Sequence, residues 1–288
     1  MSRPAYGLRS TLVCLVAIGA WSIASPAQQP GQSGGSVVYV EPVQSLHRPI
    51  YDKLKAERWL ERIQSVIQLF KTPKPVGLRL DNCNGEVEAW FEHDAITVCY
   101  EYLHVVARQI EARSLPPWVG SGEALGGAFV DAVLHELGHA LFRYHRIPIL
   151  GREEDAADQL SVFLILYLGG DDATGLIRGV ANVYLTWMLF ARDRASGDAL
   201  AALRHREARA HPTPAQRLYN LVCLALGSDP DDFAALAKAI DLSKQRVEDC
   251  PAEYAQVEAA FRKLVRPHVD ETREAEAKRQ FLYFTTLK

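Results

Sequence analysis

Two histidines and a glutamate interrupt an otherwise apolar segment, Val133 to Leu141, in the middle of the chain. The apolar residues of this segment recur with the spacing of a helix. At 100° per residue, His135 and His139 stand about 40° apart and one turn apart, so both imidazoles can reach one Zn²⁺ at about 2.0 Å. Glu136 can instead act as general base on a water activated by the metal. The segment therefore predicts a helix that carries two zinc ligands and a catalytic carboxylate.

A catalytic zinc also needs a third protein ligand, and two regions of the sequence could supply it. His145 follows His139 by six residues. On a continuing helix it would lie about 120° away from the face of His139 and about 9 Å further along the axis. We therefore expect His145 to lie outside the site.

The better candidate follows the turn-forming residues Pro148 to Gly151, after which a second helix can fold back on the first. Glu154 and Asp158 share one face of this helix because they are four residues apart. We predict that Glu154 binds the metal and that Asp158 accepts the second ring N–H of a ligating histidine. Glu153 and Asp155 remain alternative ligands, and the small residues at 156 and 157 allow the two helices to approach closely.

The chain of 288 residues is long enough for one large core, and 48% of its residues are hydrophobic. An amphipathic pattern predicts a helix over Tyr51 to Phe70. Strand-like runs follow at Val76 to Leu80, Glu86 to Phe91 and Ala95 to Tyr100, with His93-Asp94 as a turn. After Pro116-Pro117 the pattern is helical nearly to the end, and Thr213-Pro214 and Asp229-Pro230 mark helix starts. This order predicts an α+β fold, mostly α, with a small β-sheet before the active-site helix and a helical C-terminal half.

The N-terminal segment predicts export. Arg3 and Arg9 precede an apolar run that ends in small residues, so we expect a signal peptide over 1–27, then a flexible linker over 28–48 and a single domain over 49–288. The apolar runs Val162 to Leu168 and Val183 to Phe190 are far shorter than the about 20 residues of a membrane span, which favours buried core helices. We therefore expect a periplasmic or extracellular protein with no stable membrane span after signal cleavage.

Four cysteines remain after the predicted signal: Cys83, Cys99, Cys223 and Cys250. An even number in an exported chain indicates disulfides. Proximity favours Cys83 with Cys99 and Cys223 with Cys250, although four cysteines allow three connectivities. Acidic residues outnumber basic ones by 35 to 32, which argues against nucleic acid as a partner.

The second helix and its neighbours resemble a known group of enzymes. Gluzincin metallopeptidases carry Glu-x-x-x-Asp on the helix after their two histidines, at the positions of Glu154 and Asp158 here. The sequence most resembles the bacterial metallopeptidase family called domain of unknown function 4344, through the segments 99–101, 135–139, 151–159 and 216–220 together with Cys223. The resemblance covers about residues 80 to 250 and implies a zincin-like fold and an exported zinc peptidase.

A further resemblance concerns His211-Pro212 and Arg217. HtpX-like peptidases have a similar His-Pro followed by an arginine, placed beside the zinc. The resemblance implies that His211 stabilises the developing oxyanion or caps the metal, with Arg217 orienting it or adding positive charge. A loop histidine before a capped helix, with Arg217 in a salt bridge, is the structural alternative.

The sequence thus predicts an endopeptidase with one Zn²⁺ per chain that acts on peptides or unfolded proteins. Zincin folds commonly pair an extended substrate with an exposed strand before the active-site helix, and Ala95 to Cys99 is the candidate strand. The alternative is a zinc-binding, chaperone-like or latent quality-control protein of the same fold with little turnover. Oligomeric state and cleavage preference have no signal in the sequence.

Overall fold

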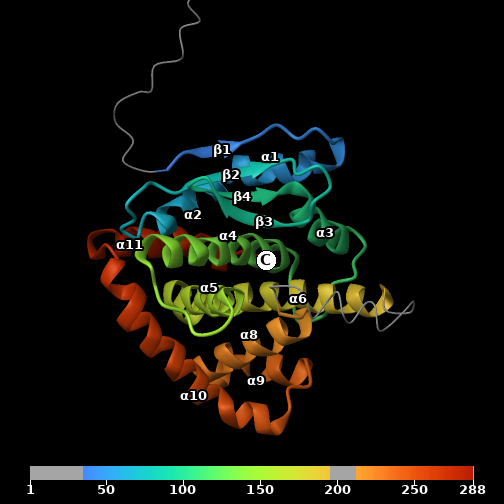
Figure 1. Ribbon diagram of the computed structural model, residues 1–288. Coiled ribbons are helices and arrows are strands. Elements are labelled where there is room, and N and C mark those ends of the chain that lie inside the picture. Colours follow the sequence, from blue (N-terminus) through green and yellow to red (C-terminus); the bar gives the residue numbers. More distant parts are fainter. Residues whose placement is uncertain (1–34, 195–211, 288) are drawn as a thin grey trace, which may run out of the picture. The chain divides into compact units, whose positions relative to one another are not determined.

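Four short strands and a larger set of helices build residues 35–194 and 212–287, the parts of the chain that the computed structural model describes (Figure 1). The predicted signal peptide 1–27 and His211 lie outside these residues. The strands are β1 (Val37–Tyr39), β2 (Gly77–Asp81), β3 (Ala89–Glu92) and β4 (Ala95–Cys99). The α-helices are α1 (Arg48–Ala56), α2 (Trp59–Ile67), α3 (Tyr100–Glu111), α4 (Ser121–His145), α5 (Glu153–Gly169), α6 (Thr174–Arg194), α8 (Pro214–Ser228), α9 (Pro230–Ala239), α10 (Lys244–Ala260) and α11 (Glu271–Thr285). The predicted α+β fold, mostly α with a small sheet before α4, is confirmed.

Helix α4 is the centre of the core. The sheet lies on one side of it, with β3 and β4 in contact, and α5 and α6 lie on the other side (Figure 1). Helices α4 and α6 cross where both have glycine: a Cβ at Gly179 would lie 1.9 Å from the carbonyl oxygen of Glu123, and one at Gly127 would lie 2.6 Å from the backbone nitrogen of Val180. This close crossing leaves most of α4 buried, so its polar side chains need partners within the protein.

The sheet has the order β1-β2-β4-β3, with β1, β2 and β4 parallel and β3 antiparallel to β4. The predicted turn at His93-Asp94 is confirmed, and both residues have left-handed φ values of 51° and 60°. This tight turn returns the chain so that β4 lies between β2 and β3. The prediction of Ala95–Cys99 as the exposed strand is therefore wrong, because β3 is the edge strand beside α4.

Tyr39 of β1 explains two corrections to the predicted N-terminal region. The segment predicted as linker already pairs with the sheet, since Val37–Tyr39 aligns with Leu78–Leu80 of β2. The predicted single helix over 51–70 is in fact the two helices α1 and α2, separated by Arg58 with a left-handed φ of 56°. The hydroxyl of Tyr39 occupies this break, where it accepts a hydrogen bond from the backbone N–H of Leu60 and donates to the Glu61 carboxylate.

The apolar runs that resemble membrane spans belong to the core. One helical stretch, Glu153–Leu189, is long and apolar enough to cross a membrane, but 67% of its most hydrophobic window is buried inside the protein. The prediction that these runs are core helices agrees with this burial.

Both predicted disulfides are present, Cys83–Cys99 and Cys223–Cys250. The second joins α8 to α10 across a separation of 27 residues. A loop of this length gives about 3 to 4 kcal/mol of stabilisation when it is closed. The α8–α10 pair is therefore held covalently on the side of α5 that faces away from the sheet.

We expect the double variant Cys223→Ser and Cys250→Ser to lose about 3 kcal/mol of unfolding free energy, because the unfolded chain regains the entropy of the open loop. Urea unfolding of oxidised wild type and variant measures this loss. Wild type measured after reduction is the control, and a variant as stable as the oxidised wild type would contradict the assignment.

His145, at the end of α4, stacks on His268 with ring centroids 3.5 Å apart. Burial lowers the pKa of His145, the neighbouring His268 lowers it further, and a hydrogen bond to the backbone of Lys71 opposes the shift. The folded protein therefore keeps His145 neutral at pH values where the unfolded chain, with a pKa of about 6.5, binds a proton.

The contribution of His145 to the unfolding free energy should fall as the pH drops below about 6.5, because the unfolded state then takes up a proton that the folded state excludes at this residue. The variant His145→Phe keeps the stacked ring and should lose less stability between pH 7 and pH 5, measured by urea unfolding with a chelator present. His93→Asn, a change at an exposed turn residue, should keep the wild-type dependence. Equal pH dependence in His145→Phe and wild type would disprove the effect.

Candidate metal centre

Small residues bring the start of α5 onto the histidine-bearing face of α4. A Cβ built at Gly138 would lie 3.3 Å from the Cα of Ala157, which is fully buried. Helix α4 ends at Arg146 with a φ of 50°, and Gly151, with a φ of 122°, helps the chain to turn back. The predicted two-helix arrangement is therefore present, with the first turn of α5 next to His135 and His139.

Three donor atoms from these helices form a small triangle. The Nε2 atoms of His135 and His139 lie 3.2 Å apart, and Oε2 of Glu154 lies 3.2 Å from the first and 3.5 Å from the second. Ligands about 2.0 Å from a tetrahedral zinc ion are about 3.3 Å from one another. The predicted ligand set His135, His139 and Glu154 is thus brought together with the spacing that a bound Zn²⁺ requires.

A carboxylate anchors the other ring nitrogen of each histidine. Asp158 Oδ1 lies 2.8 Å from Nδ1 of His135, and Glu153 Oε1 lies 2.7 Å from Nδ1 of His139. A neutral imidazole that donates from Nδ1 presents the Nε2 lone pair to a metal. Asp158 therefore has the contact predicted for it. Glu153, considered as an alternative ligand, binds the distal side of His139 instead.

The carboxylates around His135 favour a positive charge at this position. Burial lowers the pKa of His135, but hydrogen bonds to Asp158 and Glu154 raise it to about 10 overall. Two anionic partners therefore stabilise a cation at this place even against the cost of burial. His135, His139 and Glu154 could hold a metal ion, which would supply that charge.

Glu136 lies beside the triangle and faces the edge strand of the sheet. Its side chain is buried, and its pKa is raised by burial, while the neighbouring His135 and His139 act in the opposite direction. A hydrogen bond with the backbone of Phe91 in β3 also favours the ionised carboxylate. Glu136 is therefore held by the sheet and has no ligand position in the triangle.

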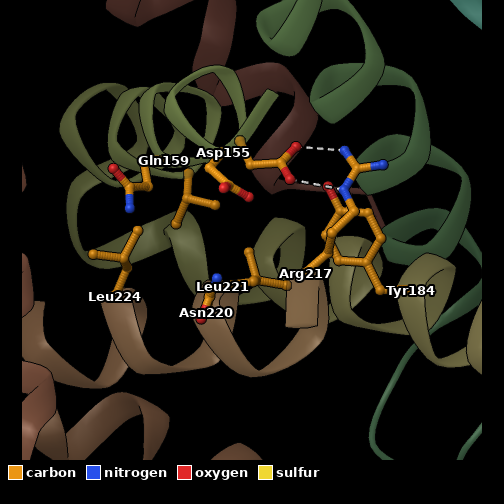
Figure 2. Close-up of a pocket in the computed structure, with 9 residues that line it drawn as sticks. Asp155, Gln159, Tyr184, Arg217, Asn220, Leu221 and Leu224 are labelled. Atoms are coloured by element: carbon orange, nitrogen blue, oxygen red, sulfur yellow. Dashed lines mark hydrogen bonds and ion pairs between the residues drawn. The ribbon is translucent and has the colours of Figure 1, made fainter. Parts of the chain in front are cut away.

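Arg217 of α8 acts on Asp158. Its Nε donates to Asp158 Oδ2 over 2.8 Å, its Nη2 donates to Oδ1, and its guanidinium lies 4.4 Å from the centre of the Tyr184 ring. Figure 2 shows Arg217 beside Tyr184, with both bonds dashed. Tyr184 in turn donates to buried Asp131, whose pKa burial raises. Arg217 thus acts on His135 indirectly, through Asp158, which contacts both residues. The predicted role of Arg217 in orienting His211 stays a prediction, because His211 lies outside the described residues.

The remaining candidates lie elsewhere. Asp155, the other alternative ligand, is paired with Arg152. His145 stacks on His268 and is not in the group of metal donors, as expected. A second cluster, Cys83, Cys99 and Glu101, has ligand-like spacing, but its sulfurs form a disulfide and are not thiolates.

A comparison with protein families decides the classification. The model of the family described as "putative metallopeptidase", domain of unknown function 4344, matches residues 39–265. The chain belongs to this family. Neither the curated proteins nor the solved structures contain a match. Membership supports peptidase activity and a metal in this site, in agreement with the donor triangle.

Sequence reasoning missed three contributors to the centre. The contact of Glu153 with His139 could have been considered from the acidic run 153–155, but the run alone does not say which carboxylate faces which histidine. The contact of Phe91 with Glu136 depends on the order of the strands and has no local signal. Asp131 lies four residues before His135 on α4, and this helical spacing could have indicated a buried partner.

We expect Arg217→Gln to weaken metal binding about tenfold, because Asp158 would lose its bidentate cation and hold His135 less firmly. Competition against a chromophoric chelator measures the zinc affinity directly. Arg152→Gln is the matched control, since it removes an exposed ion pair at the start of α5. An Arg217→Gln variant that folds and binds zinc as tightly as wild type would exclude this role.

Proposed function

We propose that the protein is an exported, zinc-dependent endopeptidase of the gluzincin type with one Zn²⁺ per chain. The observation that carries this proposal is the donor triangle of His135, His139 and Glu154, whose edges of 3.2 to 3.5 Å fit tetrahedral zinc. Both Nδ1 atoms are engaged by carboxylates, which leaves the Nε2 atoms as metal donors. Family membership independently supports a metallopeptidase.

When bound, Zn²⁺ polarises the substrate carbonyl and acidifies a water molecule. Glu136 takes the proton of that water and delivers it to the leaving amine, which makes it general base and then general acid. Its burial favours this cycle because a raised pKa makes the carboxylate a stronger proton acceptor. His135 and His139 keep their orientation throughout because Asp158 and Glu153 hold their Nδ1 atoms.

The outer edge of β3 is the proposed platform for an extended substrate. The carbonyl of Glu88 accepts a hydrogen bond from the backbone of Cys99 in β4. Because hydrogen bonding alternates along a strand, Trp90 also faces β4, and the backbone groups of Ala89 and Phe91 face away from it. A peptide that pairs with this edge lies beside Glu136, with which Phe91 already shares a hydrogen bond.

Export places the reaction in the periplasm or outside the cell. The predicted signal peptide over 1–27 is one support, and the two disulfides are the other, since such bonds persist in oxidising compartments. Substrates there are peptides or unfolded proteins that can present an extended segment.

The variant Glu136→Gln should lower kcat/KM on a labelled unfolded protein by a factor of about 10² to 10⁴, because the amide cannot accept the proton. Bound zinc, measured by metal analysis, should stay at one ion per chain, since Glu136 is no ligand. Glu248→Gln is the control, because Glu248 is exposed and distant in sequence from the centre.

The same experiment separates the alternative function. A zinc-loaded wild type that cleaves neither unfolded protein nor a broad peptide library would favour the zinc-binding, chaperone-like protein instead. Equal cleavage by wild type and Glu136→Gln would rule out the proposed mechanism.

A further inference from the structure

One face of α4 extends beyond the metal centre to an exposed arginine. Arg143 follows Glu136 by seven residues, which places it about 20° away around the helix and about 10.5 Å further along it. Strand β3 runs beside α4 (Figure 1). Phe91 of this strand relates to both residues, because its backbone shares a hydrogen bond with Glu136 and its ring lies 5.4 Å from the guanidinium carbon of Arg143.

The charge of Arg143 is not compensated in the way that other arginines near the centre are. Arg217 is paired with Asp158, and Arg152 is paired with Asp155. Arg143 is exposed, and within residues 35–194 and 212–287 no carboxylate forms an ion pair with it. Its guanidinium instead lies over the face of the Phe91 ring, which positions a cation without neutralising it.

The surroundings of the metal make this cation distinctive. Glu136, Glu153 and Glu154 gather around the histidines, so the side chains of the centre offer no fixed cation that would recognise a substrate carboxylate. Further along the same side of α4, Arg143 provides an exposed positive charge. A peptide with a carboxylate at the corresponding distance gains attraction from Arg143, whereas one with a carboxylate at the scissile bond does not.

Resting on the proposed peptidase function, we propose that Arg143 is a specificity residue that binds a carboxylate of the peptide substrate about three residues from the scissile bond. The distance follows from the geometry, since about 10.5 Å along the helix corresponds to about three residues of extended chain at 3.3 Å each. Arginine suits this task because its planar fork matches a carboxylate. The carboxylate belongs either to a Glu or Asp side chain or to the free C-terminus of a short peptide.

Quenched fluorescent peptides with Glu or Gln at each of the four positions on either side of the cleaved bond provide the test, each made with a free and with an amidated C-terminus. For wild type we expect kcat/KM to be about threefold to tenfold higher for Glu than for Gln at one position about three residues from the bond, and the preference should weaken with added salt. A preference that depends on the free C-terminus instead identifies the terminal carboxylate as the group bound.

In Arg143→Gln the ratio of Glu to Gln should fall to about one, and Arg143→Glu should favour Lys at the same position. Arg262→Gln, the same charge change at an exposed arginine of the C-terminal region, should keep the wild-type ratio. Zinc content and circular dichroism verify that each variant is folded and loaded.

Cleavage by wild type without any preference for a carboxylate would overturn the assignment of Arg143, as would a preference that persists in Arg143→Gln. In both cases the peptidase function itself would stand, because the peptides are cut. Absence of cleavage in every peptide would instead remove the proposed function and this inference with it.

Discussion

The packing of α5 on α4 is the contact on which the rest of the site depends. Helix α4 lies in the middle of the core and carries His135 and Glu136 where both are buried. Buried ionisable groups are costly unless they are paired and hydrogen-bonded. The first turns of α5 provide that pairing, and they can do so because Gly138 and Ala157 allow the two backbones to approach.

The carboxylates that pair with the two histidines differ in their exposure to solvent. Asp158 is buried and is matched by Arg217 from α8, so the anchor of His135 is enclosed and charge-balanced. Glu153 is 53% exposed at its side chain and anchors His139 from the solvent side. The carboxylate that supports His135 is therefore buried, whereas the one that supports His139 is open to solvent.

The sheet contributes to the same centre through its edge. The tight turn at His93-Asp94 pairs β3 with β4, and the pairing of β4 with β2 leaves β3 as the outer strand. Phe91 of β3 contacts Glu136 through its backbone and Arg143 through its ring. The proposed proton-transfer group, the proposed substrate platform and the proposed carboxylate-binding residue are thereby linked by a single residue of β3. Two disulfides stabilise segments on either side of this arrangement, one at the end of β4 and one between α8 and α10.

Local patterns were enough for much of this protein. Helical spacing gave the pair His135 and His139 and the pair Glu154 and Asp158, since residues three or four apart share a face whatever the surrounding fold. Proline and capping residues located the starts of α8 and α9, because those signals act within one turn. Proximity along the chain identified both disulfides.

Other features depend on contacts between distant segments. Glu153 and Glu154 are adjacent in sequence, and their side chains point about 100° apart around the helix. One holds a histidine and the other is the candidate metal donor, and only the orientation of α5 on α4 decides which has which role. The break between α1 and α2 depends on the hydroxyl of Tyr39 from β1, and the exposed position of β3 depends on where the hairpin joins the sheet. The sequence by itself determined the donor groups and the chemistry they allow, because these follow from residue type and helical period. The tertiary structure decided which group faces the metal, which holds a ligand and which strand lies at the edge, because those roles arise from the packing of elements that are separate in the chain.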